Sequence, residues 1–147
     1  MNVDITDLKT VRLSQDGSAV IILDQTCLPG SEVYVSLSSA EEIWEAIYRL
    51  KVRGAPAIGI AAAYGIYVCS RQIAANTYGG FCSEFLRIKD YLASSRPTAV
   101  NLVAALDRME KVVVAHSVNP VPEIVELLRV EAEAIRAENA ACLLYTS

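Results

Sequence analysis

The stretch PAIGIAAAYGIYVCS, residues 56–70, carries no charged side chain and is rich in alanine and glycine. Pro56 suits the first turn of a helix, where its missing N–H is not needed. The small residues that follow allow neighbouring backbones to approach closely, and a helix that is apolar on every side is buried on every side. We therefore predict a helix that starts near Pro56 and is buried all round.

Upstream of this stretch the sequence is typical of short strands. The pair Asp16-Gly17 lies between the apolar runs 11–13 and 19–23 and predicts a hairpin with a tight primed turn, because glycine tolerates a positive φ. Residues 28–30, LPG, mark a second turn, and residues 33–37 alternate like a third strand. Three short strands predict a small antiparallel sheet.

Four more helices are expected around the uncharged one. The first opens with a capping box, Ser38 with Glu41 or Ser39 with Glu42, and should end near Val52. The helix after the uncharged one is expected at about 81–93, following a loop at residues 76–80. The last two helices are expected after the breaks at 94–98 and 119–122. The apolar positions of these helices include Ile43, Ala46, Ile47, Leu50, Val100, Val103, Ala104, Leu106, Val113, Val114, Ile124, Leu127, Leu128, Val130 and Ile135.

The predicted fold class is therefore α+β, with a β-rich part at about residues 1–37 and a helical bundle at residues 38–139. The chain of 147 residues has 53% apolar residues and a net charge of −4, which indicates a folded domain and argues against a nucleic-acid binder. Its N-terminus has no apolar core of a secretory signal. The four cysteines are scattered and form no CxxC pair, so neither a zinc site nor a disulfide framework is expected. Reduced cysteines fit the cytoplasm.

Two loops combine an arginine with a proline that can open a helix. They are Arg53-Gly54-Ala55-Pro56 and Ser95-Arg96-Pro97-Thr98. A helix N-terminus favours an anion, glycine lets the backbone approach it, and the guanidinium fork of arginine can hold a phosphate with two hydrogen bonds. If the loops converge, they form a phosphate clamp. The alternative is that both arginines are surface residues or cap the preceding helices.

Other polar candidates have simpler interpretations. Cys69 lies within the apolar helix and is expected in the core rather than as a nucleophile. Cys27 follows a strand but has no histidine base beside it in the sequence, and His116 is expected to cap a helix or lie on the surface. Trp44 and Tyr48 are four residues apart and are expected to pack on one helix face.

The longer motifs around these loops resemble a known family. Residues 52–65, VRGAPAIGIAAAYG, are similar to the signature of the methylthioribose-1-phosphate isomerase family, and residues 95–102, SRPTAVNL, followed by LDRM at 106–109, resemble its second N-terminal motif. LDQT at 23–26 is similar to an early pattern of that family. The order and spacing agree from about residue 8 to residue 136.

The resemblance implies an aldose–ketose isomerase that converts S-methyl-5-thioribose 1-phosphate to S-methyl-5-thioribulose 1-phosphate in methionine salvage, without a metal or other cofactor. It also implies a homodimer and a Rossmann-like C-terminal domain. The substrate phosphate is then bound by Arg53, Gly54, Ala55 and Arg96. The alternatives are an isomerase of 5-deoxyribose 1-phosphate or ribose 1,5-bisphosphate, and a non-catalytic subunit related to the regulatory subunits of the initiation factor 2B exchange factor.

The chain also departs from the family pattern. The catalytic cysteine and aspartate of these enzymes lie in the C-terminal domain, so no catalytic residue is expected in this chain. Residues 140–147, AACLLYTS, do not resemble the family's continuation and are interpreted as a truncation or a foreign tail. The high mean hydropathy of +0.33 fits helices whose apolar faces pack on that missing domain. The alternative, a membrane span at 54–70, is disfavoured by its shortness, its proline and its glycines.

Overall fold

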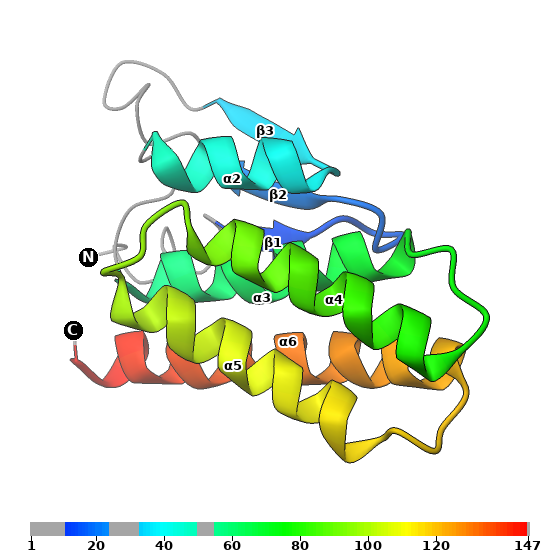
Figure 1. Cartoon of the computed structure of the whole chain (residues 1–147). Coiled ribbons are helices and arrows are strands. Elements are labelled where there is room, and N and C mark those ends of the chain that lie inside the picture. The colour runs from blue at the N-terminus through cyan, green and yellow to red at the C-terminus, as the bar shows by residue number, and fades with distance from the viewer. Residues whose placement is uncertain (1–10, 24–32, 50–54, 147) are drawn as a thin grey trace.

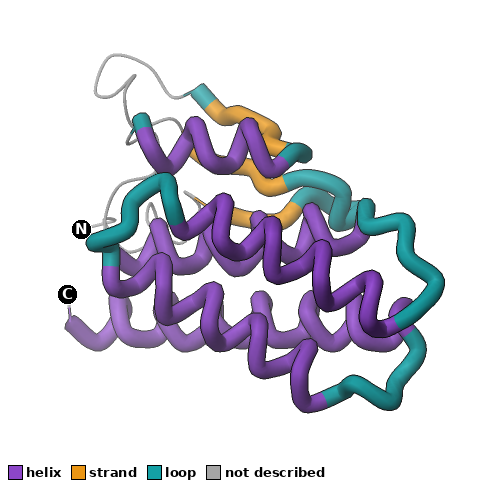
Figure 2. Tube along the Cα trace, in the orientation of Figure 1, coloured by secondary structure: helices purple, strands orange, loops and turns teal. Residues whose placement is uncertain are grey.

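The computed structural model describes residues 11–23, 33–49 and 55–146. A three-stranded sheet comes first, and five helices follow it (Figures 1 and 2). The elements are β1 (Val11–Leu13), β2 (Val20–Leu23), β3 (Tyr34–Leu37), α2 (Ala40–Tyr48), α3 (Ala55–Arg71), α4 (Tyr78–Ala93), α5 (Val100–Ala115) and α6 (Val121–Thr146). The α+β class and the order of the elements predicted from the sequence are confirmed.

The sheet is antiparallel with the order β1-β2-β3, and Ile22 pairs with both Val11 and Val35. Gly17 has a φ of 76°, as expected of an Asp-Gly turn. The prediction of a tight primed turn is wrong, however, because Ser14 N–H donates to Ala19 O at 2.8 Å and so encloses a four-residue loop, residues 15–18. Local hydrogen bonds to the Asp16 carboxylate, chiefly from Ser18, stabilise this wider loop and lower the pKa of Asp16 to about 2.

Helix α2 starts with the second of the two predicted capping registers. Ser39 is the N-cap, and its hydroxyl accepts a hydrogen bond from Glu42 N–H at 3.1 Å. The Glu42 carboxylate accepts from Ser38 N–H at 2.9 Å in return. The helix ends at Tyr48, so the predicted end near Val52 is wrong. The predicted core position Leu50 lies outside the described residues.

Helix α3 begins at Ala55, one residue before the predicted start. Every residue from Ile58 to Ser70 is buried, which confirms the prediction of burial on all sides. The neighbours that cover it are α2, α4, α5, α6 and the strands β1 and β2. The uncharged stretch is thus the core helix around which the other elements pack.

Helix α4 starts three residues earlier than predicted. Thr77 is the N-cap, and its hydroxyl accepts a hydrogen bond from Gly80 N–H at 3.2 Å. This bond supplies an acceptor to a first-turn donor, so Tyr78, Gly79 and Gly80 are helical although the sequence predicted a loop. The buried face of α4 consists of Phe81, Phe85, Ile88 and Leu92.

The core faces of α5 and α6 differ in part from the apolar positions that the sequence singled out. Val100, Val114 and Val130 are exposed at 77%, 56% and 50% of their surfaces, and Ala104 is exposed as well. The residues that α5 buries are Leu102, Ala105, Leu106, Met109 and Val113. The predicted positions Ile124, Leu128 and Ile135 of α6 are buried. A run of valines gives no helical periodicity, and this explains the wrong assignment on α5.

Helix α6 runs beyond the end predicted for the helical domain. Its backbone continues through residues 140–146, so the segment interpreted as a truncation or a foreign tail is helical. That interpretation itself stays a prediction. Arg108 of α5 binds α6 through Glu131 and through a two-pronged contact with Glu138, at 2.7 and 2.6 Å. These hydrogen bonds raise the pKa of Arg108, and those with Glu138 have the largest effect.

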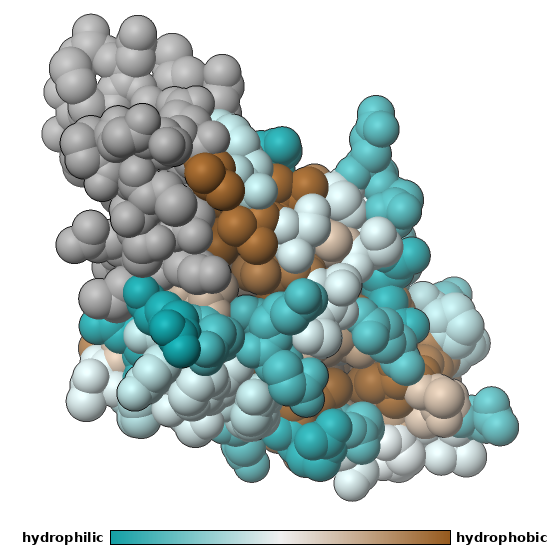
Figure 3. Space-filling model, turned by 90° about the horizontal axis from the view of Figure 1, so that it is seen from above, coloured by the Kyte–Doolittle hydropathy of each residue, from teal (hydrophilic) through white to brown (hydrophobic). Residues whose placement is uncertain are grey.

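Some large apolar side chains of the sheet region and of α2 are exposed. Val33, Tyr34 and Tyr48 are exposed at 40%, 44% and 58%. The view from above the molecule shows apolar residues among polar ones (Figure 3). Within the described part of the chain, no helix is long and apolar enough to cross a membrane. The same residues hold no group of three or more histidine, cysteine or acidic side chains arranged to bind a metal ion.

Enlarging α3 tests its role as the core helix. Ala62 is fully buried, so we expect Ala62→Leu to lower the free energy of unfolding by about 1–3 kcal/mol through overpacking. Ala137→Leu on the exposed face of α6 is the matched control and should change it by less than about 0.5 kcal/mol. Urea unfolding followed by circular dichroism measures both. Equal effects of the two substitutions would contradict the packing described here.

Candidate functional site

The starts of α3 and α5 lie at the same end of the bundle. The two helices run in the same direction, whereas α4 and α6 run the opposite way (Figure 1). Contact near the two starts is close, because a Cβ placed on Gly59 of α3 would lie 3.2 Å from the backbone oxygen of Asn101 of α5. Each of these helices follows one of the two arginine loops found in the sequence.

The structure describes only part of the predicted phosphate clamp. Arg53 and Gly54 lie outside the described residues, and Ala55 is the first residue of α3. Arg96 is half-buried in the connection between α4 and α5, and its carbonyl oxygen accepts a hydrogen bond from Ala99 N–H at 3.0 Å. The described residues therefore place the element after the first loop beside the element after the second. The contacts of the two guanidinium groups with a phosphate remain a prediction.

The connection that carries Arg96 is held by its own backbone and serines. Ser95 is buried, its N–H donates to Leu92 O at 3.2 Å, and its hydroxyl donates to the same oxygen at 2.7 Å. Ser94 N–H donates to Asp90 O and to Tyr91 O. These bonds continue the end of α4 into a tight turn, which fixes the direction in which the chain enters α5.

The first turn of α5 has backbone donors without a side-chain cap. Its N-cap is Ala99, which has no side-chain oxygen. Helices usually begin with a serine, threonine, aspartate or asparagine that accepts one of the first N–H groups. An anion can take the place of that acceptor, because the N–H groups point out of the helix start and carry partial positive charge.

A tryptophan connects the Arg96 connection to α2. Trp44 Nε1–H donates to the hydroxyl of Ser94 at 2.9 Å, and its ring stacks on Tyr48 and Tyr91 with centroids 4.8 and 6.0 Å apart. Trp44 and Tyr48 were expected only to pack on one face, and the stacking confirms that. The bond to Ser94 joins positions fifty residues apart in the sequence, so no local pattern could have predicted it.

A small hollow of about 220 Å³ lies beside the contact between α3 and α5. Gly59, Asn101, Ala105, Arg108 and Ile135 are among the residues that line it. The carboxylates of Glu131 and Glu138 already bind the Arg108 guanidinium. Arg108 therefore joins α5 to α6, and the other polar residue of the lining is Asn101.

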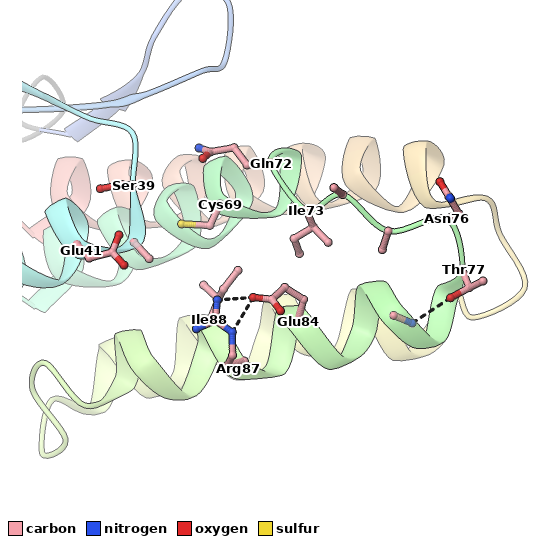
Figure 4. Close-up of a pocket in the computed structure, with 14 residues that line it drawn as sticks. Ser39, Glu41, Cys69, Gln72, Ile73, Asn76, Thr77, Glu84, Arg87 and Ile88 are labelled. Carbon is pink, nitrogen blue, oxygen red and sulfur yellow. Dashed lines mark hydrogen bonds and ion pairs between the residues drawn. The ribbon is translucent and has the colours of Figure 1, made fainter.

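A larger hollow of about 590 Å³ lies at the other end of α3 (Figure 4). Ser39, Cys69 and Gln72 line one side, and Glu84 and Arg87, which form an ion pair, lie on the other. Burial raises the pKa of Cys69 to about 12, so its thiol stays protonated and cannot act as a nucleophile near neutral pH. Cys69 is a core residue, as the sequence predicted.

The remaining candidates have structural roles or lie outside the described part. His116 is the C-cap of α5, and its Nδ1 bonds Val112 O at 2.8 Å, which confirms the prediction of a capping residue. Cys27 falls outside the described residues. Among the described side chains, those of Cys69 and Cys82 are free thiols.

Comparison with known proteins supports the resemblance seen in the sequence. The chain is 64% identical over 131 residues to the methylthioribose-1-phosphate isomerase of Parabacteroides distasonis, and 53% identical over 133 residues to that of Symbiobacterium thermophilum. A 5-deoxyribose 1-phosphate isomerase of Bacillus anthracis is 46% identical over 121 residues. These matches cover 89%, 90% and 82% of the chain but only 39%, 37% and 35% of the relatives, so the chain spans less than two fifths of their length.

Solved structures share the fold. A 5-methylthioribose 1-phosphate isomerase from Pyrococcus horikoshii matches 90% of the chain and 38% of its own, with a TM-score of 0.84 and 38% identity. The delta subunit of translation initiation factor eIF-2B from A. fulgidus matches 88% of the chain and 36% of its own, with a TM-score of 0.80 and 32% identity. Residues 51–142, more than half of the chain, match the initiation factor 2 subunit family. The chain therefore belongs to the initiation factor 2 subunit family.

Proposed function

We propose that this chain provides the phosphate-binding part of an isomerase that converts S-methyl-5-thioribose 1-phosphate to S-methyl-5-thioribulose 1-phosphate. The contact between Gly59 and Asn101 carries the proposal, because it brings the helix starts that follow both arginine loops to one place. The two relatives named methylthioribose-1-phosphate isomerase, at 64% and 53% identity, support this choice of substrate.

The proposed site binds the phosphate from two sides. The N–H groups at the starts of α3 and α5 donate to its oxygens, and Arg53 and Arg96 each add a fork of donors with a full charge. Gly54 and Ala55 leave room for the oxygens to reach the backbone. The phosphate is then held in one position, which orients the sugar for reaction.

The reaction itself belongs to other residues. An aldose–ketose isomerisation moves hydrogen between C1 and C2, and the family resemblance assigns this step to a cysteine and an aspartate in the C-terminal domain. The proposed role of the present chain is to bind and orient the substrate. We further propose that the whole enzyme is a cytoplasmic homodimer that works without a cofactor.

A second candidate substrate is 5-deoxyribose 1-phosphate. The Bacillus anthracis relative named for that substrate is 46% identical to the chain. The two sugars share the 1-phosphate and differ at C5, so the same phosphate clamp serves both, and the choice depends on residues near C5. Ribose 1,5-bisphosphate also carries a 1-phosphate, so the same clamp could bind it. The further alternative is a non-catalytic binding role, which the likeness to the eIF-2B delta subunit supports.

Removing the described arginine of the clamp tests the proposal. In the full-length protein that carries this segment, we expect Arg96→Ala to raise KM for the sugar phosphate about 10- to 100-fold, since a charged hydrogen bond contributes about 1.5–3 kcal/mol. The melting temperature should change little. Arg87→Ala, near the middle of α4 and paired with Glu84, is the control and should leave KM unchanged. An unchanged KM for Arg96→Ala would mean that the arginine is structural.

The bond between Trp44 and Ser94 should support the same site. We expect Trp44→Phe and Ser94→Ala each to raise KM a few-fold, because either change frees the connection that carries Arg96. The double variant should be no worse than the more impaired single variant, since both remove one interaction. Steady-state kinetics of the four proteins measure the coupling. Strictly additive effects would show that the bond does not hold the loop.

The chain by itself should bind but not convert the substrate. It spans less than two fifths of the related isomerases, and the cysteine and aspartate expected from the resemblance lie outside it. We expect no ketose product when the purified chain is incubated with S-methyl-5-thioribose 1-phosphate. Product formed at a rate above the uncatalysed one would contradict the assignment of binding to this chain and of catalysis to residues outside it.

A further inference from the structure

We infer that Gly59 is a positioning residue whose missing Cβ sets the distance between the starts of α3 and α5, and with it the spacing of the backbone donors that these two helix starts present to the phosphate. This inference rests on the proposed function, because it concerns how that site is shaped. Gly59 itself is buried in the seam between the two helices and would not touch the substrate.

The seam leaves no room for a side chain at this position. A Cβ on Gly59 would lie 3.2 Å from the backbone oxygen of Asn101, 3.6 Å from its Cβ and 3.8 Å from its carbonyl carbon. A distance of 3.2 Å is below the about 3.3–3.6 Å usual between a carbon and a carbonyl oxygen. Two of these three atoms are backbone, so no side-chain rotation can relieve the contact. One helix must move by a few tenths of an ångström.

The contact is placed one helical turn from the proposed phosphate. Gly59 is four residues after Ala55, and with 3.6 residues per turn the two lie on the same face of α3. Asn101 is the second residue of α5. A shift at this contact therefore moves the first turn of one helix relative to the first turn of the other.

If the two helices are pushed apart, we expect the start of α5 to move rather than α3. Val100 is 77% exposed, so nothing described packs against its outer side, whereas α3 is enclosed along its length from Ile58 to Ser70. We therefore expect an added methyl group at Gly59 to push the start of α5 outward. Hydrogen bonds to a phosphate shared between the two helix starts would then lengthen from their preferred 2.7–3.2 Å.

Such a shift should affect binding rather than chemistry. The phosphate keeps its charge and its bonds during isomerisation, so its contacts are equal in the ground state and the transition state. Loss of uniform binding raises KM and leaves kcat unchanged. A merely structural role of Gly59 would instead lower the melting temperature without a selective change in KM.

Gly65 offers a matched control on the same helix. A Cβ there would lie 2.9 Å from Cγ2 of Ile43, a residue of α2, so the clash is at least as close but points away from α5. Gly65→Ala should therefore disturb packing between α3 and α2 and leave the distance between α3 and α5 unchanged. Both substitutions replace glycine by the best helix former, so the change in helix propensity is the same.

The experiment compares Gly59→Ala, Gly65→Ala and Arg96→Ala in the full-length protein that carries this segment. The measured quantities are kcat, KM for S-methyl-5-thioribose 1-phosphate, the inhibition constant of inorganic phosphate, and the melting temperature. For Gly59→Ala we expect KM and the inhibition constant to rise about 3- to 10-fold, because hydrogen bonds to the phosphate are lengthened rather than lost and the effect should stay below that of Arg96→Ala. Gly59→Val should have a larger effect on both.

The outcomes separate this inference from the proposed function. A rise in both constants for Gly59→Ala with no rise for Gly65→Ala supports the positioning role. If Arg96→Ala raises KM but Gly59→Ala does not, or if both glycine variants raise it equally, the positioning role is wrong and the phosphate site stands. If Arg96→Ala changes neither constant, the proposed site fails and the inference about Gly59 falls with it.

Discussion

Burial of α3 on every side is the constraint on which the rest of the structure depends. A helix can be enclosed in this way only if its backbone hydrogen bonds are internal and its side chains bring few polar groups into the core. Ser70 meets the second condition by donating to Ile66 O at 2.6 Å within its own helix. Tyr64 meets it by donating to the Glu133 carboxylate of α6. Burial is the main cause that raises the pKa of the Tyr64 hydroxyl, and this hydrogen bond is the next. The polar groups of α3 therefore add contacts to the bundle instead of weakening it.

The enclosure of α3 also determines where α5 can begin. Helix α4 returns antiparallel to α3, so the chain comes back to the end of the bundle at which α3 began, and α5 starts there (Figure 1). Small residues at Gly59 and Ala105 let α5 lie close to α3. The Trp44 bond to Ser94 then ties the connection before α5 to α2, the helix that precedes the first loop. Close helix packing and one side-chain bond thus bring the start of α5 and the connection before it beside residues that lie 42 and 50 positions earlier in the sequence.

The sequence predicted the elements better than their faces and ends. The hairpin, the capping box and the core helix could be predicted because each depends on residues a few positions apart. The valines of α5 could not be assigned to a face, since Val100 and Val114 are as apolar as the residues that α5 buries. The start of α4 depends on a single hydroxyl, that of Thr77, which outweighs the two glycines after it. For the proposed site, the loops were enough to predict the two arginines, and that prediction stays a prediction. The contacts of Trp44 and Gly59 involve residues fifty and forty-two positions away, so they could be seen only in the structure.

The arrangement of the helices explains why the proposed clamp would need arginines at all. The starts of α3 and α5 lie at the end of the bundle where α2, α4 and α6 finish (Figure 1). Helix ends of opposite polarity offset one another, and the field of a helix terminus fades within about one turn. The helix starts therefore contribute local N–H donors rather than a field that extends over the site. A phosphate carries up to two negative charges, and balancing them requires full charges nearby, which the guanidinium groups of Arg53 and Arg96 would supply in the proposed clamp. An arginine within a few residues before each of the two helix starts is what the proposed phosphate site would require in this topology, and the proposal therefore depends on both loops together.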